Sequence, residues 1–263
     1  MNIAVSPRHW MTASCLCWLL ASAGVSADDL DVAVAANFLG TLQQLAPKFE
    51  QASGHHLIIS SASSGQLYGQ IKQGAPFDVF LSADSERPKQ LESEGLGVAG
   101  SRFTYAIGTL VLWSPNEGVV DAGCKVLRGG ELHMLAIADP KNAPYGAAAE
   151  QVLTAMGLWD SLNAAHHIAV AQDINQSYQF AASGNAQMAF IAKSQLATPN
   201  PLKPGMAGSS CEPPSSQYSE IAQDGVVLTH AGHAAAAQAF THWLASDSQA
   251  LAAIRAAGYR VRE

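Results

Sequence analysis

Short β-like runs alternate with helical stretches through most of the chain, and this alternation limits the possible folds more than any other feature. A strand-like run over 31–36 is followed by an amphipathic helical pattern that ends at Gly54, and strand-like runs follow at 56–61 and 78–82. Alternating β and α units are typical of parallel sheets with helices on both faces. The sequence therefore predicts an α/β fold.

The alternation continues after a long apolar run over Thr104–Ser114. Further strand-like runs lie at 132–138, 167–171, 188–192 and 225–229, and helical stretches at 65–72, 147–156, 175–183 and 233–257. Two sets of such elements predict two lobes, each a mainly parallel sheet flanked by helices, with a ligand cleft between them. We expect a kink or a shortened first turn at Pro47, a helix break near Asp247 and a Pro/Ser/Gly-rich loop over 198–216.

The first 27 residues have the pattern of an export signal. One firm positive charge, Arg8, precedes an apolar run that is too short and too mixed for a comfortable membrane span. The run ends in Val25-Ser26-Ala27, a small-residue pattern that a signal peptidase accepts. We therefore predict a signal peptide over 1–27 and a mature chain that begins at Asp28.

The charge of the chain limits its possible partners. The formal net charge is −7, and it becomes about −8 for the predicted mature chain because Arg8 leaves with the signal. An acidic chain without Lys/Arg clusters argues against nucleic acid or an anionic membrane as the partner. It does not exclude an anionic ligand, because screening over roughly 8–10 Å makes local donors matter more than net charge.

Cys124 and Cys211 are the two cysteines of the predicted mature chain. An even pair in an exported chain predicts a disulfide, and two buried free thiols are the alternative that the sequence permits. Two lone cysteines lack the paired spacing of a zinc site. The adjacent pairs His55-His56 and His166-His167 point in different directions on a strand or a helix, so we predict no site of direct metal ligation.

Four strand-to-helix junctions share one chemical character. They contain Asn37, Ser63-Ser64-Gly65, Pro144-Tyr145-Gly146 and Asp173-Ile174-Asn175. A helix start presents unpaired backbone N–H groups, and the helix dipole favours negative charge there. Apart from Asp173, the side chains are neutral, and none is Lys or Arg. The junctions therefore predict a site that holds a fully ionised dianion through an amide, hydroxyls, a phenol and main-chain donors.

Ordinary helix capping is the competing interpretation of each junction. Asn, Ser and Asp are common N-cap residues on helices that bind no ligand. Taken alone, any one of the four junctions is explained by capping. We expect Asp173 in particular to cap its own helix and to face away from an anion.

Specific motifs occur in four segments between Val34 and Gly146. They are Val34-Ala35-Ala36-Asn37-Phe38 leading into Phe49–Gly54, Ser60–Leu67, Gly74–Asp84, and Ala138-Asp139-Pro140 with Pro144-Tyr145-Gly146. Each is weak alone, but in combination they resemble the periplasmic molybdate-binding proteins. The resemblance covers essentially the whole mature chain, and the glycine-to-aspartate block is its most specific part.

The resemblance implies an oxyanion site with defined contacts. The first contact falls on Asn37, with Ala36 just before it, the second on Ser64, the third on Tyr145 and the fourth on Ile174. Tyr145 and Ile174 are expected to donate through their main-chain N–H groups, and Ala36 can offer only its backbone. These five residues form the predicted ligand site.

The family also implies a fold with approximate bounds. It is the type II periplasmic binding protein, in which two α/β lobes joined by crossing strands close on the ligand by a hinge. The first lobe is expected over 28–109 and 218–263, and the second over 110–217, including the loop 198–216. Both mature cysteines would then lie in the second lobe, which is compatible with a disulfide between them.

Ligand, partner and location are further implications of the resemblance. They are molybdate or tungstate as ligand, an ABC-transporter membrane permease as partner, and a monomer in the periplasm. No cofactor is implied, because the oxyanion is cargo. Some members place a tyrosine hydroxyl on the anion from a later strand, a position that falls on Ala192 here. We therefore expect a somewhat different donor set.

Two alternatives remain at this point. Another oxyanion, such as sulfate, thiosulfate or phosphate, would suit similar donors, although phosphate would also want a carboxylate to accept its remaining proton. A cleft enzyme of the dehydratase kind on the same fold would need an acid or a base in the cleft. Ser64 has no evident base and no Gly-x-Ser-x-Gly elbow, so we predict no enzyme.

Overall fold

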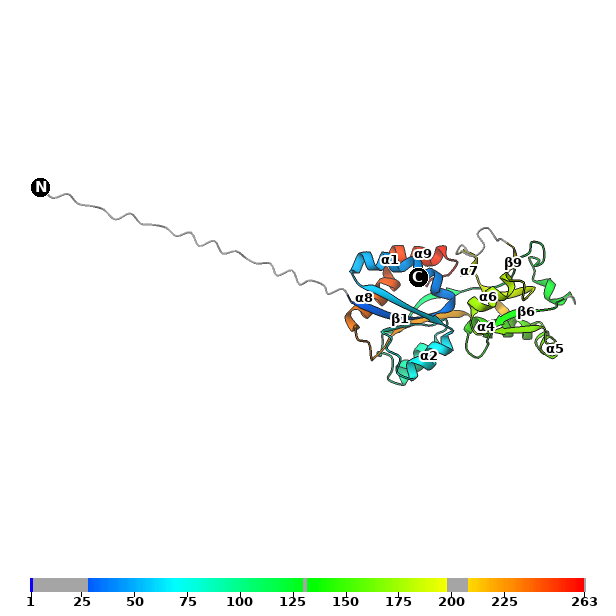
Figure 1. Cartoon of the computed structure of the whole chain (residues 1–263), viewed down its shortest axis with the longest axis horizontal. Coiled ribbons are helices and arrows are strands. Elements are labelled where there is room, and N and C mark those ends of the chain that lie inside the picture. The colour runs from blue at the N-terminus through cyan, green and yellow to red at the C-terminus, as the bar shows by residue number, and fades with distance from the viewer. Residues whose placement is uncertain (2–27, 130–131, 198–207, 263) are drawn as a thin grey trace.

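The computed structural model describes Met1 and residues 28–129, 132–197 and 208–262. The predicted signal peptide over 1–27 therefore lies outside the described residues. Among the described residues, no helix is long and apolar enough to cross a membrane. Two sheets lie side by side along the longest axis of the molecule (Figure 1).

The first sheet has five strands in the order β2-β1-β3-β10-β4. Their bounds are β1 Asp29–Ala35, β2 His56–Ala62, β3 Val79–Leu81, β4 Phe103–Gly108 and β10 Ile221–Val227. β1 pairs in parallel with β2 and β3, whereas β10 is antiparallel to both β3 and β4. Four strands thus run in one direction and only β10 is reversed, which agrees with the predicted mainly parallel sheet.

Helices cover both faces of the first sheet because its central strands are apolar on both sides. Val32 and Val34 of β1 pack with α1 (Leu39–Ser53), α8 (Ala234–Ser246) and α9 (Ser248–Ala256). Ala33 packs on the opposite face, with α2 (Ser64–Lys72) and α3 (Glu86–Ser93). Figure 1 shows α1 and α9 on one side of β1 and α2 on the other.

The second sheet repeats the arrangement of the first, in the order β7-β6-β8-β5-β9. Its strands are β5 Leu110–Ser114, β6 Leu135–Ala138, β7 Ile168–Ala171, β8 Met188–Ala192 and β9 Ser209–Cys211. β6 is parallel to β7 and β8, and β5 is antiparallel to β8 and β9. The reversed strand again holds the fourth place, so the two sheets share one topology.

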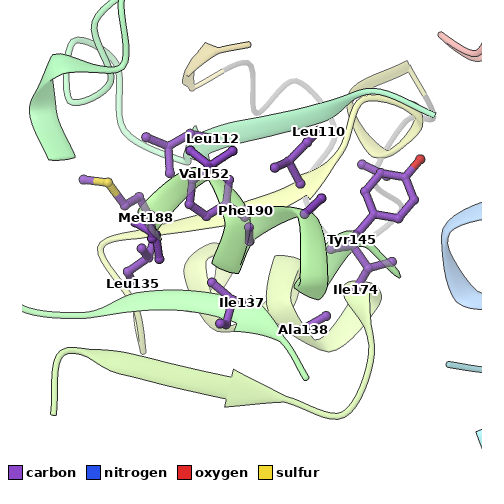
Figure 2. Close-up of a cluster of buried hydrophobic side chains, with 14 of the residues drawn as sticks. Leu110, Leu112, Leu135, Ile137, Ala138, Tyr145, Val152, Ile174, Met188 and Phe190 are labelled. Atoms are coloured by element: carbon purple, nitrogen blue, oxygen red, sulfur yellow. The ribbon is translucent and has the colours of Figure 1, made fainter. Parts of the chain in front are cut away.

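The buried strand β5 divides the core of the second half. Leu110 and Leu112 pack with α4 (Pro144–Ala155), in the cluster that Figure 2 shows, and α5 (Trp159–Ala164) follows α4 on this side. Val111 and Trp113 face the other way and pack with α6 (Ile174–Ala182). Each sheet with its helices is one lobe below.

The chain passes between the lobes at Thr109. The predicted apolar run Thr104–Ser114 is two strands, β4 and β5, which belong to different sheets and are separated by this single residue. The chain returns through the short helix η3 (Ser215–Gln217) and enters β10. Because β4 and β10 are neighbouring strands, both passages lie at the same edge of the first sheet.

Several local predictions can be compared with the structure. Asp247 ends α8 and caps α9 through bonds from the N–H groups of Gln249 and Ala250, which confirms the predicted break. Pro47 lies inside α1, which runs unbroken over 15 residues, so the prediction of a shortened first turn there was wrong. Helices α3 and α5 were not predicted.

The predicted loop over 198–216 is only partly described, since 198–207 lies outside the described residues. Within the rest, residues 209–211 form β9, which was not predicted. β9 pairs with β5, with Leu112 opposite Cys211, and Cys211 is joined to Cys124 by a disulfide. This bond confirms the predicted disulfide, and both half-cystines are buried. It attaches this edge strand to the loop before η2 (Lys125–Arg128).

Reduction of this disulfide should destabilise the second lobe. The bridge closes a long loop, with a sequence separation of 87 residues, and removal of a native disulfide from a secreted domain costs about 2–5 kcal/mol. We expect the double variant Cys124→Ser/Cys211→Ser to unfold at a lower temperature than the oxidised wild type, with wild type plus reductant moving the same way. Equal unfolding temperatures for all three samples would contradict this role.

Candidate functional site

A small cavity lies between the two lobes where the carboxyl ends of their strands meet. Its volume is about 10 Å3, counted as space open to the centre of a water molecule, which is about what one water needs. All five predicted site residues line it, from both lobes. The full lining is Ala35, Ala36, Asn37, Ser63, Ser64, Ala83, Ala143, Pro144, Tyr145, Asp173 and Ile174. The structure therefore brings the five predicted residues together at one place between the lobes.

A larger groove of about 220 Å3 opens beside the cavity and shares Ala83 and Pro144 with it. Its lining includes three carboxylates, those of Asp84, Glu86 and Glu220. Carboxylates repel an anion, so we place the candidate anion site in the smaller cavity and not in this groove.

Four helix starts surround the cavity. The 3-10 helix η1 (Ala36–Phe38) and α4 have no side-chain cap, and α4 begins with Pro144, which has no N–H to satisfy. At α6 the carboxylate of Asp173 accepts from the N–H groups of Asn175 and Gln176, but not from that of Ile174. Backbone donors at η1, α4 and α6 are thus presented to the cavity with the favourable end of the helix dipole. At α2 the N–H groups of Gly65 and Gln66 are bonded to Asn142 and Ser63.

Asp173 caps its own helix, as predicted from its position. Its Oδ1 lies 2.8 Å from the nitrogen of Asn175 and 2.9 Å from that of Gln176. Asp173 also belongs to the cavity lining. Because this oxygen is turned toward the helix, its charge is compensated by two N–H groups.

Ser64 is the side-chain donor of the site. It is buried, and its Oγ accepts the N–H of Ala83 at 2.9 Å. A hydroxyl has one proton to donate in addition to the bonds that it accepts. Since Ala83 supplies the accepted bond, the proton of Ser64 stays available for an acceptor in the cavity. The neighbouring Ser63 instead caps α2 in a capping box with Gln66.

The junction chemistry predicted that the Asn37 amide would donate to the ligand, but this amide is bonded within the protein. Its Nδ2 donates to Oε1 of Gln223 at 2.8 Å and to the hydroxyl of Tyr259 at 3.1 Å. Both amide protons are therefore used within the protein, and the main-chain N–H of Asn37 is the donor that remains. The amide at this position supports the site from behind.

Tyr145 is buried with its hydroxyl away from the helix start. The hydroxyl accepts from Nε2 of Gln223 at 3.1 Å. In Figure 2 the ring lies at one end of the apolar cluster and its oxygen points out of that cluster. This orientation leaves the main-chain N–H of Tyr145 as its candidate donor, in line with the prediction. Burial raises the pKa of the phenol well above its usual value, so it is neutral.

The two lobes are in contact around the cavity, so the structure represents a closed state. The N–H of Gly65 donates to the carbonyl of Asn142 at 2.8 Å, and Nδ2 of Asn175 donates to the carbonyl of Ala36 at 3.0 Å. At the rim, Arg87 pairs with Asp84 in its own lobe and donates to the carbonyl of Lys141 in the other. No Lys or Arg lines the cavity itself.

Sequence reasoning missed the residues that support the site from within the first lobe. Gln223, Tyr105 and Tyr259 are buried and bond to one another or to Asn37. The polar pair Gln223-Asp224 directly before the apolar Gly225–Leu228 was the available signal, because a buried polar residue in a strand needs a partner. The expected strand begins only at Gly225 and leaves Gln223 and Asp224 outside it, whereas β10 includes both residues.

No group of three or more His, Cys, Asp and Glu side chains is placed to hold a metal ion in the described parts of the chain. The cavity offers hydrogen-bond donors, a compact space and walls from two lobes. The chemistry it can perform is therefore capture of a small anion. Two similar α/β lobes with such a cavity between them define the class of type II periplasmic binding proteins.

Comparisons with known proteins agree with this class. Residues 30–260 match the family model described as bacterial extracellular solute-binding protein. The molybdate-binding protein ModA of Azotobacter vinelandii is 44% identical over 241 residues, which are 92% of this chain and 93% of that protein. ModA of Rhodobacter capsulatus is 44% identical over 234 residues, or 89% of each chain.

A solved structure supports the same assignment. The periplasmic molybdate-binding protein of Azotobacter vinelandii superposes with a TM-score of 0.83 at 44% identity, covering 89% of this chain and 100% of the other. The chain belongs to the bacterial extracellular solute-binding proteins, among the periplasmic molybdate-binding proteins of type II fold.

Proposed function

We propose that this chain captures molybdate, and with it tungstate, in the periplasm and delivers the anion to an ABC-transporter permease. The observation that carries the proposal is the cavity lining, which combines four helix starts and a serine hydroxyl without any Lys or Arg. A fully ionised tetrahedral dianion has only acceptors, so it suits a site made of donors. The relatives named for molybdate specify which anion.

The proposed donors come from both lobes. The first lobe supplies the hydroxyl of Ser64 and the main chain at Ala36 and Asn37, and the second lobe supplies the main-chain N–H groups of Tyr145 and Ile174. Main-chain donors fixed in helices need no reorganisation when the ligand arrives. The anion is cargo, so the proposal involves no cofactor and no reaction.

Competing ligands are disfavoured to different degrees. Phosphate carries a proton near neutral pH and would want a carboxylate acceptor, but the Oδ1 of Asp173 is used in capping α6. Sulfate has the same donor requirements as molybdate and differs in size, so the relatives favour molybdate over it. A dehydratase-like enzyme would need an acid or base in the cavity, and Asp173 is the sole carboxylate in its lining.

The proposal includes the residue bounds of the two lobes, export to the periplasm and a monomeric state. We assign 28–109 and 218–263 to the first lobe and 110–217 to the second, which the membership of the two sheets supports. The leader over 1–27 would direct export, and the mature chain would act as a monomer without nucleic acid. Since the anion touches both lobes only when they are closed, binding would stabilise the closed form that the permease recognises.

Isothermal titration of residues 28–263 with molybdate, tungstate, sulfate and phosphate tests the ligand. We expect tight one-to-one binding of molybdate and tungstate and no heat from sulfate or phosphate, because these smaller anions would leave some of the donors unpaired. Heat from sulfate alone would keep the receptor class and replace the ligand. Silence with all four anions would contradict oxyanion capture.

Ser64→Ala should weaken molybdate binding by roughly 1–3 kcal/mol, the range for losing a hydrogen bond to a charged group. Ser177→Ala is the matched control, because its hydroxyl is equally buried but donates to the carbonyl of Phe190. We expect the control to lose stability while its affinity stays within about twofold of wild type. Unchanged affinity in Ser64→Ala would remove Ser64 from the site.

Gly65→Ala should prevent full closure. A Cβ at Gly65 would lie 2.7 Å from Oδ1 and 2.9 Å from Cα of Asn142 in the other lobe. We expect small-angle scattering with saturating molybdate to show a larger radius of gyration than wild type, and the affinity to fall about tenfold or more.

Gly69→Ala, on the same helix, is the control for the Gly65 variant. A Cβ at Gly69 meets nothing within 4 Å, so this variant should close and bind like the wild type. Both variants change glycine to alanine inside α2 and gain similar helix propensity. Wild-type compaction in Gly65→Ala would show that the contact with Asn142 does not limit closure.

A further inference from the structure

Gln223 on β10 is fully buried behind the anion site and connects the two lobes. Its Oε1 accepts from Nδ2 of Asn37 at 2.8 Å, and its Nε2 donates to the hydroxyl of Tyr145 at 3.1 Å. Asn37 and Tyr145 lie at helix starts of different lobes, and both line the cavity. One amide side chain thus holds a residue from each half of the site. We call these three residues the inter-lobe triad.

The backbone around the triad is shaped for this contact. The register between β10 and β4 shifts between Gln223 and Asp224, an irregularity of the kind that re-aims a side chain. Gly108, the last residue of β4, lies against the same bond: a Cβ there would be 2.1 Å from Oη of Tyr145 and 2.7 Å from Nε2 of Gln223. The bond therefore lies beside the passage between the lobes at Thr109.

Burial makes the triad sensitive to the loss of a partner. The exposed fractions of Asn37, Tyr145 and Gln223 are 5%, 2% and 0%. An amide donor left without an acceptor in such surroundings loses its hydrogen bond and does not recover one from water. The bond between Gln223 and Tyr145 joins the lobes, so its free energy favours the closed arrangement over one in which the lobes have separated.

We propose that Gln223 is a positioning residue for the anion: without touching the ligand, it holds the donor of Asn37 and the donor of Tyr145 at the spacing that a bound tetrahedral anion requires. The proposal rests on the proposed function and adds a residue outside the cavity lining. It assigns the Tyr145 hydroxyl to coupling between the lobes and not to the anion. Affinity should then depend on a hydroxyl that never contacts the ligand.

Tyr145→Phe is the central test, because it keeps the main-chain N–H and the ring and removes only the hydroxyl. We expect its molybdate affinity to fall by about fivefold to thirtyfold, mainly through faster dissociation. Gln223→Leu should cause a larger loss, because it also removes the acceptor of the Asn37 amide. The double variant should lose no more than Gln223→Leu alone, because that variant has already removed the bond to Tyr145.

Ser177→Ala is again the control. The hydroxyl of Ser177 is buried and donates to the carbonyl of Phe190 in the same lobe, without contact to the triad. We expect this variant to lower the unfolding temperature of the ligand-free protein, with affinity within about twofold of wild type. A purely structural role for Tyr145 would give the same pattern in Tyr145→Phe.

The outcomes separate the proposal from the proposed function. If wild type binds molybdate and Tyr145→Phe binds it equally well, the positioning role of Gln223 is overturned and the receptor function stands. Equal losses of affinity in Tyr145→Phe and Ser177→Ala would also overturn it, because coupling between the lobes would then play no part. If the wild type binds none of the four anions, the proposed function fails, and this inference fails with it.

Discussion

The unpaired N–H groups at the starts of the helices are the constraint on which the rest of this structure depends. A βα unit delivers its helix start to the carboxyl end of its strand, and each lobe delivers two such starts to the same small cavity. Neither lobe surrounds an anion by itself. The topology shared by the two sheets, each with one reversed strand, brings the four starts face to face.

The charged side chains of the protein lie mostly outside the cavity that the donors surround. The chain is acidic overall, yet the cavity lining has no cation, and its single carboxylate is turned toward its own helix. Arg87, which donates to the other lobe at the rim, is already paired with Asp84. A dianion in this cavity would be stabilised by oriented dipoles at contact distance. The net charge of the chain would have little effect on this stabilisation.

Sequence periodicity and junction chemistry predicted much of this arrangement. The α/β alternation placed most strands within a few residues. The four junctions contain Asn37, Ser64, Tyr145 and Ile174, which line the cavity, and the family resemblance added Ala36. These features are local: a strand end and a helix start are adjacent in the chain. The disulfide was also predictable, because Cys15 and Cys17 lie in the predicted signal peptide and leave Cys124 a single partner.

The contacts that could not be predicted join residues far apart in the chain. Nothing near Asn37 in the sequence shows that its amide is used by Gln223, 186 positions away, or that Tyr145 shares this partner. Helix α3 was missed because its eight residues bury only Pro88 and Leu91, too few for a clear periodic pattern. Sequence thus located the donors, whereas their support depends on tertiary packing.

Close backbone approach explains how such a small cavity can keep its size. Gly65 meets Asn142 at one side of the cavity, and Gly108 leaves room for the bond between Gln223 and Tyr145 at the other. Main-chain contacts leave little room for adjustment, and tightly packed buried side chains have few alternative rotamers. The gap between the closed lobes is therefore nearly fixed. An anion that is too large holds the lobes apart and loses the contacts between them. One that is too small leaves donors unpaired. Under the proposed function, selection by size would follow from closure, because the hydrogen bonds that join the lobes would also set the distance between the donors.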